Sequence, residues 1–283
     1  MAILQDLRTW RFWRHFLIIS FAVFGGLSTV LQTLNVTIPT FTVFQGSPFL
    51  ILTVAISVIA GLIWSWPRPI AQDYSVPNTK ITIVKGNILD ETKHIVIGTN
   101  DTFDTETPVI ISQESLQGQA LQRLYGGDLK ELDATLASAL IGKPTVGSIK
   151  KSGKQLQYGV GTIATVKQSA RLIFFLAYCE MDTNNTARST PDKVWKSLLL
   201  LWDEVSKHAN GGAVSVPVIG GGQARLSSIV PAQDAIRLTI LSFMFASRSS
   251  KICDELRIVV RPEDYKRLDR LELQSFLSSL RSS

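Results

Sequence analysis

Residues 16–67 of this 283-residue chain contain no Asp, Glu, Lys or Arg, whereas charged side chains recur through the rest of the sequence. Two apolar runs, 16–34 and 49–66, lie inside this uncharged stretch. Each is close to the roughly 20 apolar residues that a helix needs to cross about 30 Å of hydrocarbon. One charge at mid-helix costs roughly 2.5–3.5 kcal/mol on insertion scales, so the absence of charge favours insertion. We therefore expect a two-helix transmembrane hairpin over residues 16–66, with a short uncharged connection at 35–48.

Arginines flank the predicted hairpin on one side only. Three of them precede the first apolar run and Arg68 follows the second, while the connection has no positive residue. The positive-inside rule then places both ends of the chain in the cytoplasm. Residues 1–15 are expected to form a cytoplasmic amphipathic segment before the first span. A cleaved signal peptide, a buried helical hairpin of a soluble protein and inert anchoring by two helices are the alternatives.

The net charge is weak evidence for a nucleic-acid partner. The chain has 29 Lys and Arg against 23 Asp and Glu, which gives a formal charge of +6. Residues 1–68 hold four of the arginines and one aspartate, 4 − 1 = +3, so half of the excess lies at the predicted membrane flank. A basic flank beside a membrane accounts for such an excess. Nucleic acid is therefore not an expected partner.

Beyond a predicted linker at 67–79, strand and helix patterns alternate. Strand-like runs lie at 80–84, 94–99, 162–166, 172–177, 213–219 and 256–260. Helical patterns lie at 114–125, 128–140, 191–205 and 231–246, and a last one starts at Pro262. This alternation predicts a three-layer α/β domain over 80–283.

Glycines, amides and hydroxyls gather where the predicted strands end. Gly86 and Asn87 follow the first strand, Asn100 follows the second, and residues 220–225 follow the fifth. In open α/β sheets, ligands bind outside the carboxyl ends of the strands. Glycine lets backbone N–H groups approach phosphate oxygens, and a helix start such as residues 115–119 adds a favourable field. Each of these motifs alone also fits an ordinary turn.

The order of these motifs resembles the macro domain family. That family has a Gly-Asp-Ile turn after its first strand, and this chain has Gly86-Asn87-Ile88. Its second strand ends in asparagine, as HIVIGTN ends at Asn100 here. A first phosphate loop leads into a helix, like SLQGQ at 115–119, and a strand containing proline runs into a second phosphate loop, like VSVPVIGGGQARL at 214–226. The resemblance covers about residues 80–265, and it implies a three-layer macro-like domain with a mixed sheet flanked by helices.

The chain looks most like a macro-like branch that is joined to two N-terminal membrane helices, as in the membrane-bound effectors of Thoeris anti-phage systems. This resemblance implies a multi-pass protein of the bacterial inner membrane. Its macro-like domain would sense a derivative of ADP-ribose, such as an amino-acid conjugate, made by a partner TIR-domain enzyme. Binding would assemble or rearrange the transmembrane helices and disrupt the membrane. A homo-oligomer is expected, and the small-residue pairs Ala22/Gly26 and Ser57/Gly61 fit close helix packing.

The resemblance also implies roles for individual residues. Asn87 would read the base, Asn100 would contact the distal ribose, and backbone N–H groups of the two loops would hold the diphosphate. Arg225 is a candidate to pair with a phosphate or a carboxylate. The expected ligand-binding residues are Gly86, Asn87, Ile88, Asn100, Ser115, Leu116, Gln117, Gly118, Gln119, Gly220, Gly221, Gly222, Gln223, Ala224 and Arg225.

Departures from the family pattern favour binding over catalysis. Asn87 stands where many macro domains have an aspartate, and the first loop lacks the usual triple glycine. The acidic residue that hydrolytic macro domains carry near this loop has no obvious counterpart. We therefore expect no catalytic residue and no cofactor. An ADP-ribosyl hydrolase, and a membrane scaffold that reads ADP-ribosylated partners, are the alternative functions.

Other motifs lack the context that their chemistry needs. Residues 159–164 match GxGxxA, but β-branched residues follow where a dinucleotide fold needs a helix. Residues 147–155 have one residue too many for a P-loop and are expected to form an exposed basic hairpin. The three histidines have no metal-ligand spacing. Cys179 and Cys253 have no framework spacing, so we expect buried free thiols.

Overall fold

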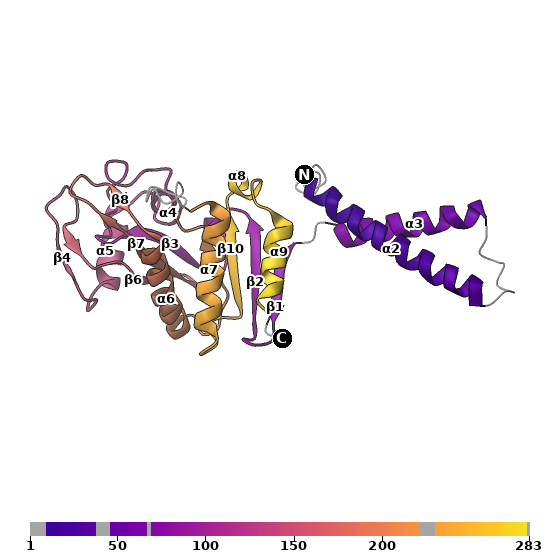
Figure 1. The fold of residues 1–283 in the computed structure, drawn as a ribbon. Coiled ribbons are helices and arrows are strands. Elements are labelled where there is room, and N and C mark those ends of the chain that lie inside the picture. Colours follow the sequence, from indigo (N-terminus) through magenta and orange to yellow (C-terminus); the bar gives the residue numbers. More distant parts are fainter. Residues whose placement is uncertain (1–9, 38–45, 67–68, 221–229, 282–283) are drawn as a thin grey trace. The chain divides into compact units, whose positions relative to one another are not determined.

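The computed structural model describes residues 10–37, 46–66, 69–220 and 230–281. The chain divides into two compact units, Met1–Arg68 and Pro69–Ser283. In its described part the first unit consists of two helices, α2 (Trp10–Thr37) and α3 (Ser47–Ser65), which lie against each other (Figure 1). Both helices are long and apolar enough to cross a membrane. α2 begins earlier than predicted because no proline or glycine interrupts the chain between Trp10 and Phe16.

Small and hydroxyl-bearing residues form the inner face of α3. Its buried residues are Thr53, Ser57, Gly61 and Ser65, which are spaced four apart. A side chain at Gly61 would place its Cβ 2.1 Å from Oγ of Ser20 on α2, so the two helices approach closely at this point. The pair Ser57/Gly61 therefore lies at the helix contact.

The other predicted small-residue pair, Ala22/Gly26, does not lie at this contact. Ala22 is exposed, and a Cβ on Gly26 would meet nothing within 4 Å. The contact face of α2 instead carries larger side chains, such as Phe16. Residues 1–9, most of the predicted amphipathic segment, lie outside the described residues.

The second unit is built on a mixed sheet with the strand order β1-β2-β10-β9-β3-β7-β6, and β8 pairs with β7. Neighbouring strands from β2 through β7 in this order run parallel, while β1, β6 and β8 are antiparallel to their neighbours. The strands are β1 (Ile70–Tyr74), β2 (Thr79–Lys85), β3 (His94–Asn100), β6 (Ile163–Gln168), β7 (Arg171–Met181), β8 (Ala187–Arg188), β9 (Val214–Pro217) and β10 (Glu255–Val260).

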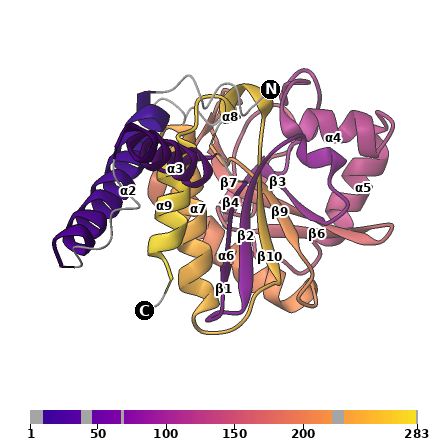
Figure 2. The same ribbon diagram turned by 90° about the vertical axis from the view of Figure 1, so that its right-hand side faces the viewer.

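Helices cover both faces of this sheet (Figure 2). One face packs against α6 (Pro191–His208), α7 (Ala232–Ser247) and α9 (Arg270–Ser279), and its core includes the fully buried Trp202 and Phe243. The opposite face packs against α4 (Leu116–Leu124), α5 (Leu129–Ala139) and the short 3-10 helix η2 (Ile88–Asp90). The β-branched residues of the parallel strands face these two cores alternately, as period-2 side-chain geometry requires. The predicted three-layer α/β fold is confirmed.

Two boundaries differ from the sequence-based expectation. Residues 70–79, assigned above to the linker, form β1 and its turn into β2. In β1 Ile70 and Tyr74 are buried, and the Tyr74 hydroxyl donates to the Leu277 carbonyl at 2.7 Å. The adjacent polar residues Gln72 and Asp73 interrupt the apolar alternation that predicts a strand, so the sequence did not reveal this edge strand. The last helical pattern is split into α8 (Pro262–Tyr265) and α9, because Asp269 caps a new helix by accepting from the Glu272 N–H.

The basic segment at 147–155 belongs to a hairpin, as predicted, between β4 (Gly147–Ser148) and β5 (Leu156–Gln157). Its exposure was predicted wrongly at one residue. Lys150 is exposed, but Lys151 is buried and its Nζ lies 2.6 Å from Oδ2 of Asp104. Asp104 comes from the loop after β3, which is distant in sequence, so a pattern of local charges could not reveal the pair.

Candidate functional site

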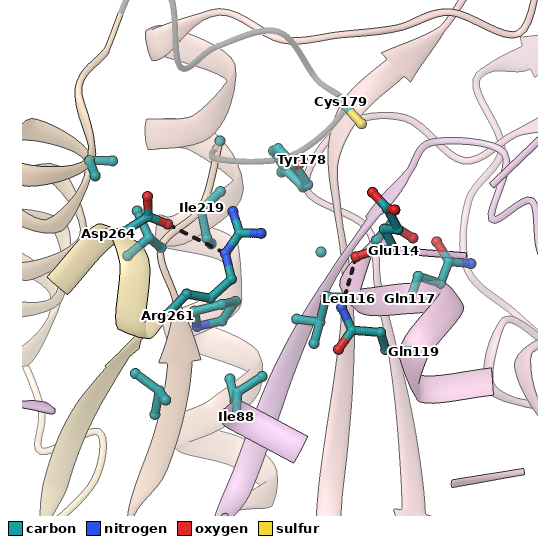
Figure 3. Close-up of a pocket in the computed structure, with 18 of the residues that line it drawn as sticks. Ile88, Glu114, Leu116, Gln117, Gln119, Tyr178, Cys179, Ile219, Arg261 and Asp264 are labelled. Atoms are coloured by element: carbon teal, nitrogen blue, oxygen red, sulfur yellow. Dashed lines mark hydrogen bonds and ion pairs between the residues drawn. The ribbon is translucent and has the colours of Figure 1, made fainter. Parts of the chain in front are cut away.

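A cavity of about 1040 Å³ lies where the parallel strands end. Its lining includes residues at the carboxyl ends of β2, β3, β7, β9 and β10, together with the starts of α4 and α7 (Figure 3). Because neighbouring parallel strands end at one edge of a sheet, turns that are far apart in sequence meet here. The cavity is at the upper end of the range of about 300–1,000 Å³ that is typical of small-molecule sites.

The structure brings most of the predicted ligand-binding residues together in this cavity. Those that line it are Gly86, Asn87, Ile88, Asn100, Ser115, Leu116, Gln117, Gln119 and Gly220. Gly118 does not line it. The remaining predicted residues, Gly221, Gly222, Gln223, Ala224 and Arg225, lie outside the described residues.

Asn87 has a structural role at the end of β2. Its Oδ1 accepts a hydrogen bond from the Leu89 N–H at 3.0 Å and so caps η2. The N–H of Gly86 is also used, because it donates to the Val260 carbonyl at 2.9 Å. This bond joins the ends of β2 and β10. The Asn87 side chain lies at the cavity wall, and one lone pair of its oxygen is already engaged by the Leu89 N–H.

Asn100 is the centre of a tight turn after β3. Its Oδ1 accepts from the Thr102 N–H at 3.1 Å, the Thr102 hydroxyl at 2.9 Å and the Asp104 N–H at 3.1 Å. The pairing of β3 with β7 shifts register at Asn100, which re-aims this residue at the strand end. The two backbone donors identify the oxygen, so the Nδ2 group is the part of Asn100 that remains for a ligand.

The first turn of α4 offers two backbone donors. The Ser115 side chain caps the helix by accepting from the Gly118 N–H at 3.0 Å, and the Gln119 N–H donates to the Ser115 carbonyl at 2.9 Å. The N–H groups of Leu116 and Gln117 make no hydrogen bond to any residue that the structure describes. Unsatisfied N–H groups at a helix start are a favourable place for an anion.

Gly118 serves a close approach of two backbones. A Cβ at this position would lie 2.3 Å from the Ser112 carbonyl oxygen and 2.9 Å from the Gln113 Cα. The loop that ends in Ser112 therefore packs directly on α4, and any side chain at Gly118 would push the loop away. Gly118 shapes the wall of the cavity without lining it.

Sequence reasoning missed the residues that follow β10. Arg261, Glu263, Asp264 and Arg267 line the cavity, and the guanidinium group of Arg261 extends into it in Figure 3. The Nε atom of Arg261 lies 3.4 Å from Oδ2 of Asp264. The rule that ligands bind at the carboxyl ends of parallel strands applies to β10 as well. The residue after Val260 could therefore have been predicted as a site residue on the same ground as Gly86 or Asn100.

The wall formed by β7 was also missed. Tyr178 and Cys179 line the cavity, and the ring of Tyr178 occupies the space where a Cβ on Gly98 would stand, 2.6 Å from its Cε1. Burial raises the pKa of the Cys179 thiol to about 12, so this group stays a neutral thiol and a poor nucleophile near neutral pH. Both cysteines are buried and free, as predicted.

Charges of both signs surround the cavity. Its described lining carries the carboxylates Glu114, Glu263 and Asp264 and the guanidinium groups of Arg261 and Arg267. Positive side chains therefore do not outnumber negative ones in the described lining. A diphosphate here would depend on backbone N–H groups at the start of α4 in addition to the arginines. In the described part of the chain, no group of three or more His, Cys, Asp or Glu residues could hold a metal ion.

A mixed sheet between two helical layers, with one cavity across the ends of its parallel strands, defines a macrodomain-like α/β protein. The family model for the macro domain of the Thoeris protein ThsA matches residues 81–261. The chain belongs to this family.

Two solved macrodomain structures are among those that the chain is similar to. A mutant of the macrodomain of Oceanobacillus iheyensis has 15% sequence identity and a TM-score of 0.50, with 75% of this chain and 95% of that chain covered. The macrodomain of Trypanosoma brucei, solved in complex with ADP-ribose, has 13% identity and a TM-score of 0.46, with 71% and 72% covered. No curated protein sequence matches this chain.

Proposed function

We propose that this protein is a membrane-anchored sensor and effector that binds a derivative of ADP-ribose in the cavity of its macro domain. One observation carries the proposal: the residues predicted for the base (Asn87), the ribose (Asn100) and part of the phosphate loops (Leu116, Gln117 and Gly220) lie on separate strand ends and a helix start, and they line one cavity of about 1040 Å³. Family membership supports the same conclusion, since the matched family is the macro domain of a Thoeris protein.

The cavity supplies chemistry for each part of such a ligand. Apolar side chains of Ile88, Val259 and Ile219 offer a surface for a base. The amide of Asn100 suits ribose hydroxyls. The N–H groups of Leu116 and Gln117 suit a phosphate, and the guanidinium group of Arg261 adds a positive charge.

The membrane part of the proposal rests on α2 and α3. Both are apolar enough to span a bilayer, and the arginine flanks favour cytoplasmic ends in the bacterial inner membrane. A ligand that binds one arrangement of the macro domains more tightly stabilises that arrangement, and the attached helices follow. In this proposal the ligand comes from a TIR-domain enzyme, the protein assembles with further copies of itself, and the rearranged helices disrupt the membrane during anti-phage defence.

The binding step is tested by calorimetry on the full chain in detergent, with ADP-ribose and amino-acid conjugates of ADP-ribose as ligands. We expect saturable binding of at least one of them. Arg261→Met should weaken binding by roughly 10- to 100-fold, because it removes a charge-assisted contact worth about 1.5–3 kcal/mol. Arg248→Met is the matched control, since Arg248 is an exposed arginine that does not line the cavity. No binding at millimolar ligand by folded protein would reject the proposal.

The effector step is tested with vesicles of phosphatidylethanolamine and phosphatidylglycerol that contain the full chain and a trapped dye. The bound ligand should release the dye, and Arg261→Met vesicles should need a higher ligand concentration. Ligand binding without dye release would support the proposed role as a sensor and would reject the proposed role as a membrane effector.

Hydrolysis of an ADP-ribose derivative is a second candidate, and one observation favours it. Glu114 lines the cavity beside Ser115, so an acidic side chain is present near the first loop after all. A carboxylate at such a site is able to activate a water molecule. An ADP-ribosylated peptide incubated with the protein should lose ADP-ribose if this function holds, and Glu114→Gln should abolish the loss. A peptide that stays intact would exclude hydrolysis of that substrate.

A further inference from the structure

An ion pair that is shielded from solvent lies next to residues that line the cavity. Nζ of Lys151 is 2.6 Å from Oδ2 of Asp104, and the two side chains are 0% and 1% exposed. Removing two charges from water costs several kcal/mol per ion, and a hydrophobic pair of similar volume often stabilises a fold at least as well. A buried pair of this kind therefore points to a requirement for defined geometry at this place.

Further hydrogen bonds fix the orientation of the pair. The Lys154 N–H donates to Oδ1 of Asp104 at 2.8 Å, and the Thr102 hydroxyl shares its single hydrogen between Oδ2 of Asp104 and Oδ1 of Asn100. Lys151 also donates to the Ser152 carbonyl at 3.1 Å. The hairpin that carries Lys151 and Lys154 is thus clamped onto the loop after β3.

The same loop reaches the cavity through two side chains. The Asp104 N–H donates to Oδ1 of Asn100, and the Asp104 carbonyl accepts from Nε2 of Gln117 at 2.5 Å. Asn100 and Gln117 both line the cavity, one at the end of β3 and the other in α4. Lys151 itself does not line the cavity. A displacement of Asp104 would move both cavity residues together.

The backbone of this loop is held in a demanding conformation. Phe103 has φ +52°, in the left-handed region that is uncommon for a non-glycine residue, and its ring is fully buried against Tyr158. Such a conformation persists only where the surroundings over-determine it, and it concentrates at ligand sites.

We propose that Lys151 is a positioning residue for the ligand site: it holds Asp104, and through Asp104 it sets the places of Asn100 and Gln117. This inference rests on the proposed function, because it assumes that the cavity binds ADP-ribose. It assigns a role in affinity to a basic hairpin that lies outside the cavity.

The test compares two lysines of one hairpin in the full chain in detergent. Lys151→Met removes the buried charge, while Lys150→Met removes an exposed charge from the adjacent residue. We expect Lys151→Met to raise the Kd for ADP-ribose by on the order of tenfold, which corresponds to about 1.4 kcal/mol. Lys150→Met should change the Kd by less than about twofold. Folding of each variant is followed by thermal unfolding, and Kd is measured well below each midpoint.

A double-mutant cycle separates positioning from a merely structural role. If Lys151 acts through Gln117, the Kd change caused by Lys151→Met becomes smaller in a Gln117→Ala background. Equal fold-changes in the two backgrounds would overturn the proposal, and so would a folded Lys151→Met variant with unchanged Kd. If the wild type binds neither ADP-ribose nor its amino-acid conjugates, the proposed function is overturned, and this inference with it.

If Lys151→Met does not fold, the coupling between hairpin and cavity is measured on the wild type by amide hydrogen exchange. Saturating ADP-ribose should slow exchange of the Lys154 N–H, which donates to Asp104, because binding stabilises the arrangement that this bond belongs to. Amides near the end of α6, around Val205, are the reference. Bound ligand that leaves Lys154 exchange unchanged would reject the coupling of hairpin and cavity.

Discussion

Gly118 lies in the first turn of α4, where the sequence motif suggested a phosphate loop. Its N–H is occupied by Ser115, and its missing side chain is what allows the Ser112 carbonyl to approach. Single residues of the site thus divide into those that line the cavity and those that allow other residues to line it. Asn87 and Asn100 combine both roles, because each caps a turn with its oxygen while it lines the cavity.

Gly118→Ala should weaken both folding and binding. Its Cβ would stand 2.3 Å from a backbone oxygen that cannot rotate away, so we expect a loss of about 1–3 kcal/mol in stability. The Kd for ADP-ribose should rise, because α4 and the loop at Ser112 separate. Gly147→Ala is the control, since its nearest neighbour atom is 3.9 Å away. Thermal unfolding and calorimetry measure the two effects, and a Gly118→Ala protein as stable as Gly147→Ala would contradict the close approach.

Asp101 predicts a pH dependence of stability. Burial raises the pKa of its carboxyl above the ordinary 3.8, although the Met181 N–H and the Gln157 amide partly oppose the shift. A folded-state pKa above the unfolded value means that the contribution to stability is full below the unfolded pKa and is lost as pH rises through the folded pKa. Asp101→Asn removes this loss. The thermal midpoint of the variant relative to wild type should therefore increase as pH rises above about 4. A pH-independent difference between the two proteins would show that Asp101 does not titrate in this way.

At the scale of elements, α2 and α3 contact each other where Gly61 meets Ser20 and Phe16. Without a hydrophobic driving force between helices in lipid, association depends on such close packing. The close approach of the two helices is confined to the region of Gly61, where an added Cβ would overlap Ser20. At Gly25, by contrast, a Cβ would meet nothing within 4 Å.

Gly61→Val should therefore loosen the helix hairpin, while Gly25→Val should not. The added side chain would overlap Oγ of Ser20, and the helices must separate or rotate. Titration of the full chain with SDS measures the resistance of the hairpin to unfolding. We expect a lower midpoint for Gly61→Val only, and equal midpoints for the two variants would argue against this contact.

At the scale of the whole molecule, the boundary between the two units predicts which fragment folds. A fragment 69–283 retains β1, whereas a fragment 80–283 lacks it and loses the buried side chains of Ile70 and Tyr74. Burial of each such side chain contributes roughly 1.5–3 kcal/mol, and α9 loses its hydrogen bonds to β1.

We expect fragment 69–283 to unfold cooperatively and to bind ADP-ribose as the full chain does. Fragment 80–283 should unfold at a much lower temperature or aggregate through the exposed edge of β2. Circular dichroism melts and size-exclusion chromatography compare the two. Equal melting temperatures would mean that β1 is not part of the folding unit.

Sequence alone predicted the class of fold and nine of the residues that line the cavity, because these depend on local patterns. Alternating strand and helix periodicity was enough for three layers, and the edge rule for parallel strands pointed to Gly86 and Asn100, which line one cavity. Two long uncharged runs were enough to expect α2 and α3. What depended on long-range contacts escaped prediction.

Only the tertiary structure decided the rest. The sequence of β1 has no strong strand pattern. The strand forms because Ile70 and Tyr74 become buried and the Tyr74 hydroxyl bonds to α9. Arg261 joins the site because β10 lies beside β2, and Lys151 is buried because the hairpin folds onto Asp104. In each case the partner lies far along the chain. Local periodicity carries no information on which distant residue will meet a given side chain, and the packing of the sheet supplies it.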